Sequence, residues 1–170
     1  HQITAPDLKL PTWRGPAFPQ TDGETTAAFF VIANAVNFCF WGTPKWTVDY
    51  QRKKFDGSLG LFAAFTRALE EGLPVLDANY LASLEAKDLA WILRGNVEIP
   101  LAAERVACLR ELGQVLLSGF NGTPLNLIAS ARNSAPELVH LLTTQFPRFN
   151  DTATLNGIDI AFHKRAQLVC

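Results

Sequence analysis

The chain has 170 residues, of which 48% are hydrophobic and 18% charged, and its formal net charge is −1. This length suits one domain, and the hydrophobic fraction indicates a packed core rather than a disordered chain. The near-neutral charge argues against a protein that holds duplex nucleic acid through a basic face. A small anionic ligand needs only one or two cations and is compatible with this charge.

The three cysteines, Cys39, Cys108 and Cys170, lie far apart and form no CxxC pair, so we expect reduced thiols in a cytoplasmic protein. The His, Cys and acidic residues show no metal-ligand spacing. No apolar run reaches the length of a membrane span, and the N-terminal residues lack the regions of a signal peptide. The sequence therefore predicts neither a metal site nor a membrane segment.

Proline and glycine mark the start of the chain, where the first 23 residues contain four prolines and two glycines. This composition predicts an extended arm over 1–23, followed by a helical domain over 24–170. The first helix is predicted from about 24 to 40, ending before Gly42. Its apolar stripe at helical spacing comprises Phe29, Ile32, Ala33, Val36 and Phe40.

Three further helices are predicted after a short extended segment, TVDY, at 47–50. Asp56 precedes a periodic apolar stretch that stops at Gly72, which predicts the second helix. The stretch 83–95 repeats this pattern, and Pro100 suits the first turn of the helix after it. The buried face of that helix is expected to comprise Leu101, Cys108, Leu109, Leu112, Val115 and Leu116.

The last third of the chain contains a helix-start signal and a hairpin signal. Ser134, followed three residues later by Glu137, predicts a capped helix over about 135–146. Asn156-Gly157, between two β-prone runs, predicts a hairpin. The final residues, HKRAQLVC, have the pattern of a helix that a longer chain would complete. Together these patterns predict a mainly α fold with one short β-hairpin.

Four separated blocks of sequence carry a resemblance to a known family. They are NFCFWG (37–42), KFDGSLGLFAAFTRALEEGLPVLDANYLASL (54–84), IPLAAERVACLRELGQVLL (99–117) and FHKRAQLV (162–169). In this order they resemble the queuosine salvage family of queuosine 5′-phosphate N-glycosylases, which are similar in fold to the helical DNA glycosylases. The resemblance extends, with interruptions, from about residue 27 to residue 170.

The resemblance implies hydrolysis of the bond between ribose and the 7-deazaguanine base of queuosine 5′-monophosphate, with no metal and no organic cofactor. Queuine would be released for reuse in transfer RNA. Family members continue beyond the KRAQ block, and the acidic residue proposed for hydrolysis lies in that later part. The expected partners are therefore the nucleotide and the C-terminal remainder of the same protein. The alternative is a nucleoside-binding or assembly half without activity of its own, whereas the net charge disfavours a DNA repair glycosylase.

Aromatic residues near the end of the first predicted helix are the candidates for holding the flat base. Because Phe40 continues the stripe of that helix, it is expected in the core, whereas Phe38 and Trp41 are expected to flank the base. Tyr50 is a further substrate-binding candidate. Asn37 is expected either to read an edge of the base or to cap the helix.

Charged residues are the candidates for the sugar and the phosphate. Cleavage of an N-glycosidic bond builds positive charge on the sugar, which a carboxylate stabilises. Asp56 is the candidate for this role, with capping of the following helix as its alternative. In the KRAQ block, Lys164 is a catalytic candidate by analogy with helical DNA glycosylases. Lys164 and Arg165 are also candidates for holding the 5′-phosphate or pairing with the later carboxylate, and the alternative is a solvated helical turn. His163 is a substrate-binding candidate, with a structural role as its alternative.

Overall fold

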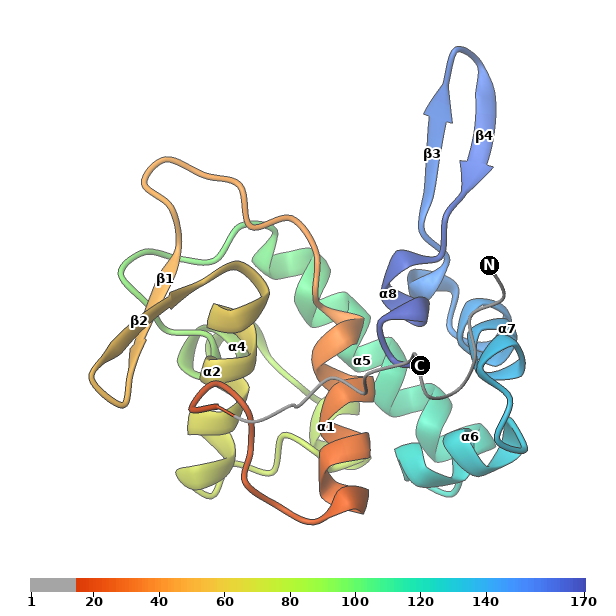
Figure 1. The fold of residues 1–170 in the computed structure, drawn as a ribbon, viewed down its shortest axis with the longest axis horizontal. Helices are drawn as coiled ribbons and strands as arrows, with labels where there is room; N and C mark the ends of the chain where they lie inside the picture. The colour runs from red at the N-terminus through yellow and green to blue at the C-terminus, as the bar shows by residue number, and fades with distance from the viewer. Residues whose placement is uncertain (1–14) are drawn as a thin grey trace, which may run out of the picture.

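The computed structural model describes residues 15–170. Within that part of the chain the fold is mainly α, as predicted, with a small antiparallel hairpin on each side of a helical body (Figure 1). Most of the predicted arm lies outside the described residues. Its last part, 15–22, contains no helix or strand and places the ring of Phe18 against those of Phe30 and Phe62. The likeness to helical DNA glycosylases stays a prediction.

Eight α-helices are found among the described residues. In chain order they are α1 (Gly23–Ala35), α2 (Gly57–Glu70), α3 (Ala78–Ala82), α4 (Ala86–Ile92), α5 (Ala102–Gly119), α6 (Pro124–Ser130), α7 (Ala135–Gln145) and α8 (Lys164–Gln167). The strands are β1 (Thr47–Tyr50), β2 (Lys53–Asp56), β3 (Thr152–Leu155) and β4 (Ile158–Ala161), and a 3₁₀ turn, η2, covers Pro147–Phe149. The patterns above predict neither α3 nor α6.

The hairpin predicted at Asn156-Gly157 is confirmed as β3–β4, and β1 and β2 form a second hairpin that the sequence does not predict. The turn between β1 and β2 consists of Gln51 and Arg52, which have positive φ angles of 46° and 60°. Tight hairpin turns require this backbone conformation, which Asn and Gly adopt most readily. A Gln-Arg pair therefore gives no hairpin signal in the sequence.

Helix α1 ends at Ala35, whereas the periodicity predicts an end near residue 40. The cause is a pair of arginines distant in sequence. The guanidinium of Arg165 donates to the carbonyl of Ala35 (2.6 Å), and that of Arg105 donates to three carbonyls just beyond it. These tertiary bonds use backbone acceptors that a longer helix would need. Residues 36–46 consequently form a loop, the α1–β1 loop.

Two other helices are shorter than predicted. The helix expected over 83–95 is α4, which stops at Ile92, where the Arg67 side chain donates to the carbonyls of Ile92 (3.3 Å) and Arg94 (2.8 Å). Helix α5 begins two residues after Pro100, because Leu101 adopts a left-handed conformation with φ of 56°. Leu101 is therefore exposed at the N-cap and does not join the buried face predicted for this helix.

The core lies around α1, α2 and α5, and α8 closes it on one side (Figure 1). Helix α3 crosses α5 at Gly113, where an added Cβ would meet the Ala82 amide nitrogen at 2.4 Å, so the contact requires glycine. The fully buried Trp46 donates its indole N–H to the Leu93 carbonyl (3.1 Å) and fixes β1 to the end of α4. The Asn34 side-chain amide donates to the Leu168 carbonyl (3.2 Å), which attaches α8 to α1.

Candidate functional site

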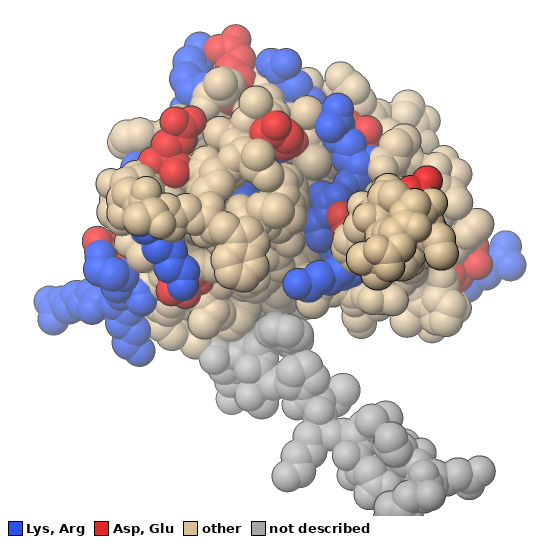
Figure 2. Space-filling view, turned by 90° about the horizontal axis from the view of Figure 1, so that it is seen from above, with Lys and Arg blue, Asp and Glu red and all other residues tan. Residues whose placement is uncertain are grey.

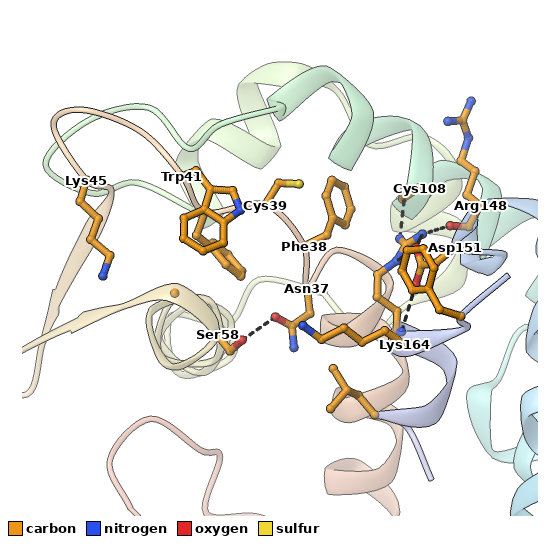
Figure 3. Close-up of a pocket in the computed structure, with 15 residues that line it drawn as sticks. Asn37, Phe38, Cys39, Trp41, Lys45, Ser58, Cys108, Arg148, Asp151 and Lys164 are labelled. Atoms are coloured by element: carbon orange, nitrogen blue, oxygen red, sulfur yellow. Dashed lines mark hydrogen bonds and ion pairs between the residues drawn. The ribbon is translucent and has the colours of Figure 1, made fainter. Parts of the chain in front are cut away.

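A pocket of about 690 Å³ lies between the α1–β1 loop, the start of α2 and the segment from η2 to α8 (Figure 3). Trp41 stands on the loop side, Ser58 lies on the first turn of α2, and Asp151 and Lys164 face them from the other side. Figure 2 shows Lys and Arg side chains gathered in the middle of this end of the molecule. The pocket therefore combines an aromatic wall with nearby positive charge.

Arg105 on α5 fixes the shape of the α1–β1 loop. The side chain is 0% exposed, and burial lowers the pKa of Arg105 to about 10, so it remains a cation at neutral pH. Its guanidinium donates to the carbonyls of Pro100 (2.9 Å), Cys39 (2.8 Å), Phe38 and Val36. One buried side chain thus satisfies backbone acceptors in a segment without regular hydrogen bonding.

Three of the four aromatic residues of the loop, Phe38, Phe40 and Trp41, differ in their surroundings. Phe38 is half-buried, and the guanidinium carbons of Arg105 and Arg165 lie 4.5 Å and 4.8 Å from its ring centroid. Since these cations occupy the ring surface, Phe38 has at most one face free for a ligand. Phe40 is half-buried and stacks on the buried Trp46 at 6.1 Å, while Trp41 is 87% exposed at the pocket rim. Trp41 is the aromatic residue best placed to meet a flat ligand.

Asn37 lies in a buried polar chain at the base of the pocket. Its side-chain Nδ2 donates to the side-chain Oδ1 of Asn34 (2.9 Å), and its own Oδ1 accepts from the Ser58 hydroxyl (2.7 Å; Figure 3). The cap of α1 is Val36 rather than Asn37. One amide N–H and one lone pair of Asn37 remain for another partner, because each amide offers two donors and two acceptor sites.

Arg165 is buried and bonded entirely to the protein. Its backbone N–H and its Nε donate to the two carboxylate oxygens of Asp151 at 3.1 Å and 2.9 Å, and Nη2 lies 2.8 Å from the second of them. Further bonds reach the carbonyls of Ala35 and Arg148 and, at 3.8 Å, the sulfur of Cys108. Burial raises the pKa of the Cys108 thiol. Arg165 thus holds η2, α8 and α1 together and neutralises Asp151.

Lys164, next to Arg165, differs from it in having an exposed side chain. Figure 3 shows this side chain extending across the pocket towards Asn37. No described residue forms a hydrogen bond or ion pair with its ammonium group. Lys45, on the far side, is paired with Asp56 at 2.6 Å. Lys164 is therefore an uncommitted cation directed into the pocket.

The three remaining predicted residues do not line the pocket. Asp56 occupies the N-cap position of α2 without a side-chain capping bond, and its partner Lys45 does line the pocket. Tyr50 lies at a separate cavity, where burial and the neighbouring Glu70 raise its pKa to about 12. His163 is half-buried before α8, and its Nδ1 has no partner in the described part of the chain.

Comparison with known proteins identifies the family. Residues 17–170 match the family model described as queuosine salvage protein. The chain belongs to the queuosine salvage protein family. It is 43% identical, over 98% of its length, to a Sphaerobacter thermophilus protein named queuosine 5′-phosphate N-glycosylase/hydrolase. Proteins of the same name from Bos taurus and Mus musculus are 33% and 34% identical over 99% and 89% of the chain.

The chain spans about half the length of these curated relatives of the queuosine salvage family, namely 52%, 51% and 46%. Among residues 15–170, no helix is both long and apolar enough to cross a membrane. Nor do those residues contain a group of three or more His, Cys, Asp or Glu side chains suited to a metal ion.

Sequence reasoning missed several pocket residues of this queuosine salvage protein. Arg148 lies in η2, and Asp151 directly precedes β3. Ser58 and Lys45 come from the opposite wall of the pocket. None carries a local motif, because each reaches the pocket only through tertiary structure. Arg105 had one detectable signal, since it falls on the helical stripe that continues through Leu109, Leu112 and Leu116.

Proposed function

We propose that the protein hydrolyses the N-glycosidic bond of queuosine 5′-monophosphate in this pocket, releasing queuine for reuse in transfer RNA. The observation that supports this most directly is that the family match over residues 17–170 includes every residue lining the pocket. The relatives carry the name of this activity. A volume of about 690 Å³ also falls in the range of small-molecule sites.

In this proposal the base enters beside the α1–β1 loop. Trp41 stacks on one face of the base, because its indole is exposed at the rim and no aromatic ring among residues 15–170 stacks on it. Phe38 contributes the edge of its ring, because two guanidinium groups lie over the ring surface. Asn37 donates its remaining amide N–H to the edge of the base, with its orientation fixed by Ser58 and Asn34.

The phosphoribosyl group lies between the two positively charged sides of the pocket. Lys164 binds the 5′-phosphate or stabilises the reacting sugar, because its ammonium group is directed into the pocket and unpaired among the described residues. Asp56 is the proposed carboxylate for the charge that develops on the sugar; it lies outside the pocket lining but is paired with Lys45, which lines the pocket. Water supplies a hydroxyl group to C1′ and a proton to the departing base nitrogen. Asp151 is not assigned this role, because Arg165 neutralises it.

Incubation of the protein with queuosine 5′-monophosphate, followed by chromatography, tests the proposal. Free queuine in amounts that grow with time and enzyme concentration is the expected result. Cleavage of damaged duplex DNA without release of queuine would replace the proposal with a repair activity.

A second function is a nucleoside-binding or assembly half that needs further polypeptide for catalysis. Two observations favour it: the chain spans about half of its relatives, and the carboxylate that lines the pocket, Asp151, is held by Arg165. Tight nucleotide binding without release of queuine in the same assay would establish this second function. In both cases we propose a cytoplasmic protein, in keeping with its three free cysteines.

A further inference from the structure

The β3–β4 hairpin has one apolar and one polar face. The cross-strand pairs Ala153–Ile160 and Leu155–Ile158 share a face, because directly opposed residues point to the same side and successive residues alternate. Phe162 continues this alternation beyond β4. The opposite face is formed by Thr152, Thr154, Asp159 and Ala161.

The apolar face has no cover among the described residues. All eight strand residues are exposed, with Leu155 at 61%, Ile158 at 66% and Ile160 at 43%. In Figure 1 the hairpin projects away from the helical body, and Figure 2, which looks onto this end, shows its tip as largely uncharged surface. A lone two-stranded hairpin is marginally stable in water, and a contiguous exposed apolar surface marks an interaction site.

The face also continues to the mouth of the pocket. Phe162 is 47% exposed at the base of the hairpin and lines the pocket, as does the exposed Leu168 on the following turn. The exposed Trp41 stands on the facing rim. A polypeptide lying on the hairpin would therefore reach the pocket mouth as well, which relates the hairpin to the site rather than to an unrelated surface.

We propose that this apolar face is the docking surface for polypeptide equivalent to the half of the family relatives that this chain does not span. The relatives from Sphaerobacter thermophilus and Bos taurus are about twice as long as the matched region, so they contain a further part of similar size. An apolar hairpin face beside the pocket gives that part a surface to pack on. The inference rests on membership of the family and does not depend on the proposed hydrolysis.

The test is co-expression of the 170-residue chain with the segment of the Sphaerobacter thermophilus relative outside the matched region, without nucleotide. The expected result is a one-to-one complex in size-exclusion chromatography with light scattering. The double substitution Leu155→Glu and Ile158→Glu should weaken its affinity about tenfold or more, because buried apolar contacts dominate such interfaces. The matched control, Thr152→Glu, adds charge to the polar face and should leave the complex intact.

Amide hydrogen exchange supplies a second readout. Residues 152–161 should exchange rapidly in the isolated chain and slowly in the complex. Three results would overturn the proposal: no complex, a complex that the double substitution leaves unchanged, or a homodimer of this chain that protects the hairpin. Thermal melting of the isolated variants is the folding control, and each should remain folded because the substituted positions are exposed. Because the docking experiment uses no nucleotide, a negative result would not count against the proposed hydrolysis. Equally, a negative hydrolysis assay would not count against the docking surface.

Discussion

Replacing Arg105 with methionine should destabilise the protein substantially, because the substitution keeps much of the side-chain length but removes every donor. Four carbonyl acceptors lose a charged partner, and the bond to the Val36 carbonyl is buried. Hydrogen bonds to charged groups contribute about 1.5–3 kcal/mol each. Burial of the guanidinium itself costs several kcal/mol, which the substitution removes.

The net loss expected for Arg105→Met is about 3 kcal/mol of unfolding free energy, since water replaces part of the lost bonding at the open end of the loop. For a chain of this size that corresponds to a fall in Tm of about 6–12 °C. Differential scanning calorimetry measures the change. Arg110→Met is the matched control on the same helix, because Arg110 donates to a single carbonyl, that of Leu84, and should cost about 1 kcal/mol.

Nucleotide affinity distinguishes a role in shaping the pocket from a purely structural one. Arg105→Lys keeps the charge but not the planar fork, so it should retain more stability than Arg105→Met while still weakening nucleotide binding. If Arg105→Met and Arg110→Met melted at the same temperature, the claim that Arg105 organises the α1–β1 loop would be refuted.

Three further predictions concern the pocket. Trp41→Ala should weaken nucleotide binding by about 1–3 kcal/mol in calorimetry and leave Tm nearly unchanged. Trp91→Ala, at an exposed tryptophan outside the pocket, should change neither, and matching losses of affinity and Tm in Trp41→Ala would contradict the stacking role. Lys164→Ala should weaken binding of queuosine 5′-monophosphate by about 1.5–3 kcal/mol but barely affect binding of queuosine itself. Equal losses of affinity for the two ligands would refute a role of Lys164 in binding the phosphate. Asp56→Asn should reduce queuine release while changing stability by under about 1 kcal/mol, because its pair with Lys45 is exposed. Full turnover in that variant would refute a catalytic role for Asp56 and leave its ion pair with Lys45 as its only function.

Elements specified by neighbouring residues were predictable from sequence. Gly72 stops α2 in a left-handed conformation, Ser134 caps α7 through the Glu137 amide, and Asn156-Gly157 makes a hairpin turn. In each case the signal and the structure it specifies lie within a few residues. The end of α1 was not predictable in this way, because its cause is a set of donors on α5 and α8.

The residues of the candidate site also differ in whether the sequence alone could identify them. Family resemblance and residue type brought Asn37, Trp41 and Lys164 forward, and the structure places all three around one pocket. The same resemblance, through the KRAQ block, suggested that Arg165 was available for a ligand, yet its donors are bonded to Asp151 and to backbone carbonyls. Whether a cation faces its own protein or a pocket depends on the three-dimensional fold, which adjacent positions in a sequence do not reveal.

The bonds of Arg165 have a mechanical consequence for the hairpin. Asp151 immediately precedes β3, and the same guanidinium that holds it also binds the end of α1, where the α1–β1 loop begins. A single rigid planar group therefore joins the residue before the hairpin to the residue before the α1–β1 loop. One side chain thus sets the spacing between the base of the hairpin and the first residues of the loop.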